Sequence, residues 1–149
     1  MSDRVILLVE DNANDEALTL RSLKKANILN KVVVVRDGAQ ALDYLFARGE
    51  FSARDLDEIP QVVLLDLNLP KIGGLDVLRA IRGDPRTKLL PVVVLTSSKQ
   101  DRDLVDGYEL GANSYVVKPV DFTQFSEAVG QLGLYWLVLN EHLPTRGQP

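Results

Sequence analysis

The sequence predicts a single-domain α/β protein in which helices cover both faces of a doubly wound, five-stranded parallel sheet. Two observations support this fold class. Short apolar runs alternate with segments whose apolar residues recur at helical spacing, and this alternation repeats five times. The 149 residues are enough for one domain with a substantial core. Because parallel strands need right-handed crossover connections, the intervening helices are expected to cover the sheet.

Five apolar runs are predicted to be strands. Each is shorter than a typical helix, and most are rich in Val, Ile or Leu, as parallel strands buried on both faces are. In chain order the runs cover residues 4–9, 31–35, 62–65, 92–95 and 114–117. The third run is the clearest, because Pro60 and Pro70 bound it and Asp66 follows it directly.

The first two helices have short polar residues at their starts. Asn14 or Asp15 is expected to cap the first helix, because such side chains accept hydrogen bonds from the free N–H groups there. Asp37 precedes the second helix, which is expected to end near Gly49. Residues 50–60 are polar and longer than the usual connection between a helix and a strand, so they are predicted to be a surface insertion.

Three more helices are predicted after the third, fourth and fifth strands. The third helix covers residues 75–81 and stops before Pro85, which cannot continue a helix. The fourth covers residues 101–110, with Gly111 as its C-terminal stop. The last is predicted over residues 121–139.

The composition excludes several classes of protein. The absence of Cys rules out disulfides and thiolate metal sites. The net charge of −4 argues against non-specific binding to DNA or anionic membranes, since the 17 Lys and Arg residues are dispersed among 21 carboxylates. With no signal-like start and no long uncharged apolar run, the protein is predicted to be cytoplasmic and free of the membrane.

Polar residues follow four of the predicted strands, at the point where each strand ends. They are Glu10 and Asp11 after the first strand, Asp66 after the third, Thr96 after the fourth and Lys118 after the fifth. The carboxyl ends of parallel strands share one edge of the sheet, where open α/β folds build their sites. These side chains are therefore expected to converge.

The expected cluster has the chemistry of a cation site. Three carboxylates repel one another unless a cation lies among them, and hard oxygen ligands suit Mg²⁺ or Mn²⁺. Zinc is less suitable, because the chain has no Cys and its single His, His142, lies near the far end. With a nearby ammonium and a hydroxyl, such a site can accept a phosphoryl group, and Asp66 is the candidate nucleophile.

Each of these residues also has a simpler explanation. Glu10 and Asp11 suit the amino end of a helix, where negative charge is common. Tyr115, which lies in the fifth predicted strand, can be an ordinary half-buried aromatic residue, and a single Lys such as Lys118 usually has no special role. All of these explanations would have to hold together, so the ordered set favours a functional site.

The ordered set resembles the receiver domain of two-component response regulators. The residues that match are Glu10-Asp11, Asp66, Thr96 and Lys118-Pro119, each at the end of the corresponding strand. On this resemblance, residues 4–140 form the receiver domain and residues 141–149 a short C-terminal tail. The resemblance implies a flavodoxin-like fold with strand order 2-1-3-4-5 and five helices.

The resemblance also implies a function and a cofactor. Asp66 would accept a phosphoryl group from a phosphohistidine of a sensor histidine kinase and form an aspartyl phosphate. Mg²⁺ would be held by Asp66, Asp11 and the backbone carbonyl of Asn68, with Glu10 acting through water. The protein would be a signalling module that takes part in its own phosphorylation and dephosphorylation, and not an enzyme with a separate substrate.

On this resemblance, Asp66, Lys118 and Thr96 would carry the phosphoryl chemistry, and Thr96, Tyr115 and Pro119 would form the switch. Lys118 would pair with the phosphoryl oxygens, and the Thr96 hydroxyl would bond one of them when the switch closes. Tyr115 matches the aromatic residue that turns inward as Thr96 moves, and Lys118-Pro119 is the pair commonly joined by a cis bond. The phosphoryl charge of about −1.5 to −2 would draw these groups inward and alter the partner-binding face beside Thr96 and Tyr115.

Two features indicate a narrower resemblance. Residues 50–60 and the sequence after Tyr135 are similar to those of the single-domain regulators that accompany bacterial phytochromes, which implies a bacteriophytochrome as the kinase. The sequence after Leu139 is too short for a helix-turn-helix, so direct DNA binding is not expected.

The last predicted helix is apolar nearly all round, which indicates that a second surface, in addition to the sheet, covers it. One face suits burial against the sheet and consists of Phe122, Phe125, Val129, Leu132 and Trp136. The apolar residues outside that face are Leu134, Leu137, Val138 and Leu139. A symmetric homodimer through this helix is expected, with kinase docking or a folded-back tail as the alternatives.

Two other functions compete with this interpretation. A Mg²⁺-dependent phosphohydrolase would also use an Asp nucleophile, but Asn68, two residues after Asp66, cannot serve as a general acid. A receiver-like scaffold that dimerises or binds partners without phosphorylation is disfavoured only because the expected site residues are all present.

Overall fold

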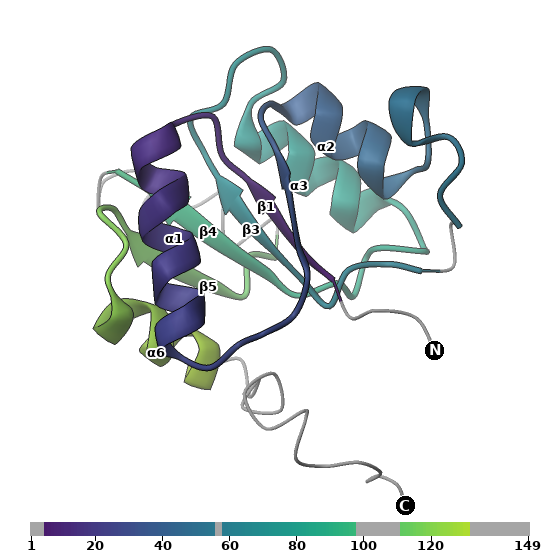
Figure 1. The fold of residues 1–149 in the computed structure, drawn as a ribbon. Coiled ribbons are helices and arrows are strands. Elements are labelled where there is room, and N and C mark those ends of the chain that lie inside the picture. The colour runs from purple at the N-terminus through teal and green to yellow at the C-terminus, as the bar shows by residue number, and fades with distance from the viewer. Residues whose placement is uncertain (1–4, 56–57, 98–110, 132–149) are drawn as a thin grey trace, which may run out of the picture.

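The computed structural model describes residues 5–55, 58–97 and 111–131, which form one parallel sheet with helices on both faces (Figure 1). The strands are β1 (Ile6–Val9), β2 (Val32–Val35), β3 (Val62–Asp66), β4 (Val92–Thr96) and β5 (Ser114–Val117). The helices are α1 (Ala13–Lys25), α2 (Gly38–Leu45), the short 3₁₀ helix η1 (Gly49–Phe51), α3 (Gly74–Gly83) and α6 (Phe122–Gln131). All strands are parallel in the order β2-β1-β3-β4-β5, so the predicted fold class and strand order are confirmed.

Alternate residues of each central strand enter two separate cores. Ile6 and Leu8 of β1 face a core closed by α1 and α6, where Phe125 is fully buried. Leu7 and Val9 face a second core closed by α2 and α3. Figure 1 shows these two helix pairs on opposite sides of the sheet. Burial on both faces explains why the strands appear in the sequence as continuous apolar runs.

Two predicted helix boundaries are wrong. The cap of α1 is Asn12, whose side chain accepts a hydrogen bond from the Asp15 N–H, and not Asn14 or Asp15, which lie inside the helix. The second helix, α2, ends at Leu45 and does not reach Gly49. The reason is Ala47, whose φ of 52° lies in the left-handed region and turns the chain away from the helix axis.

Several predictions fall outside the described residues. They concern the fourth helix over residues 101–110, the last helix beyond Gln131 and the tail over residues 141–149. The polar segment predicted over residues 50–60 is described except for residues 56–57, and its first residues complete η1. Within the described ranges, no helix has the length and apolar character needed to cross a membrane.

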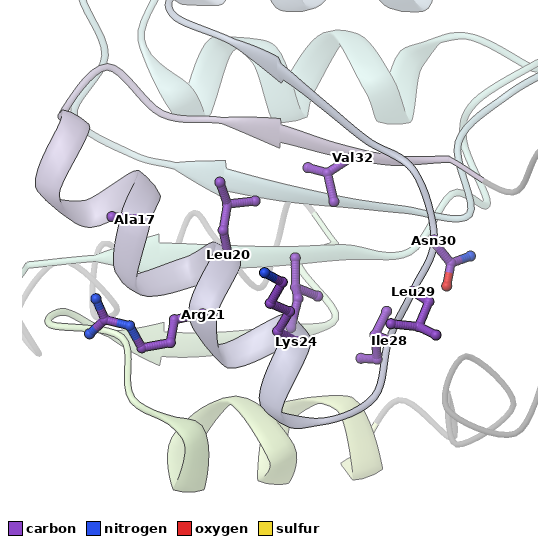
Figure 2. A pocket seen from close by; sticks show the side chains of 9 residues that line it. Ala17, Leu20, Arg21, Lys24, Ile28, Leu29, Asn30 and Val32 are labelled. Atoms are coloured by element: carbon purple, nitrogen blue, oxygen red, sulfur yellow. The ribbon is translucent and has the colours of Figure 1, made fainter.

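A groove of about 540 Å³ lies beside α1 (Figure 2). Leu20, Ile28 and Val32 contribute apolar side chains to it, and Arg21 and Lys24 contribute charged ones. Val32 is the first residue of β2, so the groove lies toward the amino ends of the strands. The polar cluster predicted at the carboxyl ends therefore lies elsewhere.

Arg82 in α3 joins three segments of the chain. Its guanidinium donates hydrogen bonds to the backbone oxygen of Gly111 (3.0 Å from Nε), the backbone oxygen of Leu90 (2.7 Å) and Oδ1 of Asn113 (2.9 Å). Asn113 Oδ1 also accepts the N–H of Val92, at the start of β4. This network fixes the chain on either side of β4.

Arg82→Met is expected to lower the free energy of unfolding by about 2 kcal/mol, because partly buried carbonyls would lose a charged donor. Arg79→Met is a matched control, since Arg79 lies on the same helix and forms an exposed ion pair with Asp76, for which a loss below about 0.5 kcal/mol is expected. Urea unfolding followed by circular dichroism measures both values. Equal losses would contradict the role assigned to Arg82.

Candidate functional site at the carboxyl edge of the sheet

The sheet brings the predicted site residues to one edge. β1, β3, β4 and β5 are consecutive neighbours, and Val9 pairs with Leu65, Asp66 with Leu95, and Thr96 with Val117. Asp66 and Thr96 are the last residues of their strands, and Glu10 and Lys118 follow theirs directly. The residues are far apart in sequence, so the parallel topology alone places them together.

Glu10, Asp11 and Asp66 form an acidic cluster. One carboxylate oxygen from each lies within 4.8 Å of the other two. Glu10 and Asp66 are buried, whereas Asp11 is exposed. Asp66 Oδ1 accepts the backbone N–H of Asn68 at 3.0 Å, which places the Asn68 backbone beside the cluster. Hard, closely spaced oxygen ligands with one open side suit a divalent cation, so these residues could hold one.

Burial has a clear effect on Glu10. Its side chain has no exposed surface, and desolvation raises its pKa to about 7. The hydrogen bond and charge of Lys118 act in the opposite direction but do not cancel the effect of burial. The negative charge of Asp66 raises the pKa further. Without a cation, Glu10 is therefore about half protonated near pH 7.

Lys118 is the positive partner of the cluster. Its Nζ lies 3.0 Å from Oε1 of Glu10, 3.2 Å from Oδ2 of Asp66 and 3.0 Å from Oδ2 of Asp15. Burial lowers the pKa of Lys118, but the hydrogen bonds to Glu10 and Asp15 and the nearby carboxylate charges raise it by more, so the ammonium stays charged. The peptide bond between Lys118 and Pro119 is cis, in agreement with the expectation for this pair.

Thr96 and its neighbours line the next part of the edge. Thr96 is fully buried, and its backbone oxygen accepts the N–H of Lys118 at 2.7 Å. The side-chain amide of Asn68 donates to Oγ of Ser97 at 3.3 Å, which joins the loops after β3 and β4. Tyr115 lies in β5, half-buried, against the core under α2 and α3. Its predicted inward movement stays a prediction.

Asp15 was predicted only as a helix cap, and its contact with Lys118 was missed. The local pattern gives no signal for this contact, because Asp11 precedes the cap Asn12 and shares no helix face with Asp15. The link to Lys118, 103 residues later, depends on how α1 packs over the sheet next to α6.

The chain is similar to known proteins over most of its length. Residues 6–130 match the model of the response regulator receiver domain. Among solved structures, the bacteriophytochrome response regulator RtBRR is 52% identical, with a TM-score of 0.86, and the match covers 93% of this chain and 83% of that one. The chain belongs to the response regulator receiver family. It is a signalling module and not an enzyme that turns over a separate substrate.

Two more solved structures are similar to this chain. The Mn²⁺-bound form of response regulator Rcp1 is 37% identical, with a TM-score of 0.71 and coverage of 89% of this chain and 92% of that one. Rcp1 comes from Synechocystis. The phosphorylated cyanobacterial phytochrome response regulator RcpA is 36% identical, with a TM-score of 0.73 and coverage of 94% and 96%.

Proposed function

We propose that Asp66 is the phosphoryl acceptor of this response regulator. One oxygen of its carboxylate forms a bond to the phosphorus of a phosphohistidine, the bond from phosphorus to the histidine nitrogen breaks, and that nitrogen keeps the electron pair. The observation that supports this role best is the position of Asp66, which is buried at a strand end between two other carboxylates and an ammonium. A carboxylate without these neighbours would only mark the end of a strand.

The proposed cofactor is Mg²⁺, with Glu10, Asp11, Asp66 and the backbone carbonyl of Asn68 as its ligands. The bound ion would neutralise charge on the oxygens of the transferred group. Lys118 would redirect an N–H toward those oxygens, and Thr96 would donate its hydroxyl to one of them. Movement of Thr96 and Tyr115 would then change the surface that binds partners.

The proposed donor is a sensor histidine kinase, and the names of RtBRR and RcpA favour a phytochrome. We place the protein in the cytoplasm with that kinase.

The homodimer predicted from residues 121–139 remains a prediction, because part of the predicted helix lies outside the described residues. Light scattering after size exclusion, with and without phosphorylation, would test the dimer and its dependence on the phosphoryl group.

Intact-protein mass spectrometry after incubation with acetyl phosphate tests the proposed chemistry. With Mg²⁺ present, a single phosphoryl adduct is expected, and peptide mapping should place it on Asp66. Chelation of the Mg²⁺ before the donor is added should prevent the adduct. A folded protein that takes up no phosphoryl group under either condition would favour the scaffold alternative.

The affinity for Mg²⁺ is expected to fall by up to about tenfold between pH 8 and pH 6. Binding needs the ionised form of Glu10, and a group with a pKa of about 7 is roughly one-tenth ionised at pH 6. Titration calorimetry at both pH values, in buffers of different ionisation enthalpy, measures the affinity and the protons released. In Glu10→Gln the affinity should be lower but nearly independent of pH, and an unchanged pH dependence there would refute the assignment.

A further inference from the structure

One of the carboxylates that contact Lys118 lies outside the acidic cluster. Asp15 Oδ2 is 3.0 Å from Lys118 Nζ, as close as Oε1 of Glu10 and closer than Oδ2 of Asp66. The two side chains are 23% and 10% exposed, so little water screens their interaction. Asp15 comes from the first turn of α1, which none of the predicted site residues occupies.

The backbone of Asp15 is fixed at both ends. Its N–H donates to Oδ1 of the cap residue Asn12 at 2.9 Å, and its carbonyl accepts the hydroxyl of Thr19 at 2.9 Å. Thr19 is fully buried, so this second anchor belongs to the core. A rigid helical turn therefore presents the carboxylate of Asp15 to the ammonium.

We infer that Asp15 is a positioning residue that keeps the Lys118 ammonium in place for the phosphoryl group, an inference that rests on the proposed function. An ammonium has three N–H donors and no acceptor. Glu10 and Asp66 are the proposed partners of the cation and of the phosphoryl group, so their contacts with Lys118 must change during phosphorylation. The contact with Asp15 need not change, and it holds one N–H on a fixed acceptor while the others are redirected.

Loss of the Asp15 charge has two consequences for the site. The stem of Lys118 has four carbons and many rotamers, so the ammonium would spend less time at the phosphoryl position. While the ammonium remained in the site, it would bind Glu10 and Asp66 more tightly and would compete with Mg²⁺ for these two carboxylates. Both effects should reduce phosphorylation, and the second should also weaken binding of Mg²⁺.

The test compares Asp15→Asn with the native protein in two measurements. Asp15→Asn is expected to lower the affinity for Mg²⁺, measured by calorimetry, and the initial rate of phosphoryl uptake from acetyl phosphate at saturating Mg²⁺, each by about five- to tenfold. Asp15→Glu, which keeps the charge, should recover much of both losses. In the Lys118→Met background, Asp15→Asn should change each value by less than about twofold, because the residue acts through Lys118.

Glu16→Gln is the matched control. It removes the same charge from the same helical turn, but Glu16 pairs with Arg36 and not with Lys118. Equal effects of Glu16→Gln and Asp15→Asn, or an undiminished effect of Asp15→Asn in the Lys118→Met background, would overturn the inference. If the native protein takes up no phosphoryl group, the proposed function fails instead, and the Mg²⁺ affinities still show whether Asp15 acts through Lys118.

Discussion

Asp66→Asn is expected to abolish Mg²⁺-dependent phosphoryl uptake from acetyl phosphate, with a loss of at least about a hundredfold, while the protein stays folded. The carboxylate oxygen is the atom that forms the bond to phosphorus, and an amide oxygen is a far weaker nucleophile. The fold should tolerate the change, because Asn has nearly the same shape and its oxygen can still accept the Asn68 N–H. Intact-protein mass spectrometry over time gives the rate, and circular dichroism confirms the fold.

Asp76→Asn provides the control for this substitution. Asp76 lies in the first turn of α3, ten residues from Asp66, and forms an exposed ion pair with Arg79. Its variant should take up the phosphoryl group at the native rate. An adduct on Asp66→Asn that forms as fast as in the native protein would show that another carboxylate, such as Asp11, is the acceptor.

The sequence was sufficient for the sheet and for the edge at which the site lies. Residues 62–65 are apolar because both faces of β3 are covered, and this local pattern needs no knowledge of distant contacts. The parallel arrangement then places Asp66 and Lys118 at one edge regardless of the loops between them. Site residues that follow strands directly are therefore the ones a sequence can reveal.

The helix boundaries and the Asp15 contact depend on interactions that the local pattern does not contain. Asn12, Asn14 and Asp15 can all cap a helix. The point at which α1 begins after β1 decides between them, and there the Asn12 N–H donates a hydrogen bond to Glu10 Oε2 at 3.2 Å. Once Asn12 is the cap, Asp15 lies in the first turn and its side chain is available to Lys118. A shift of the expected cap by two or three residues was therefore enough to miss a member of the site.

Gly74→Ala is expected to lower the free energy of unfolding by about 2–3 kcal/mol. A Cβ at this position would lie 2.5 Å from the carbonyl oxygen of Asp66 and 2.6 Å from Cα of Leu67. Both are backbone atoms at the end of β3, which cannot move aside without shifting the strand. Helix propensity favours Ala over Gly by only about 1 kcal/mol, so the steric term should dominate. Urea unfolding followed by circular dichroism measures the difference.

Gly73→Ala distinguishes this steric effect from a general effect of glycine. Gly73 has a φ of −69°, which Ala adopts readily, and a Cβ there would meet nothing within 4 Å. Because Gly73 is the cap of α3 and Ala is a poorer cap than Gly, a loss of up to about 1 kcal/mol is still expected.

Gly74→Ala should also slow phosphoryl uptake at temperatures where it remains folded, since the clash displaces the backbone of Asp66 itself. Native stability and native uptake in Gly74→Ala would show that the end of β3 is more adaptable than its close packing indicates.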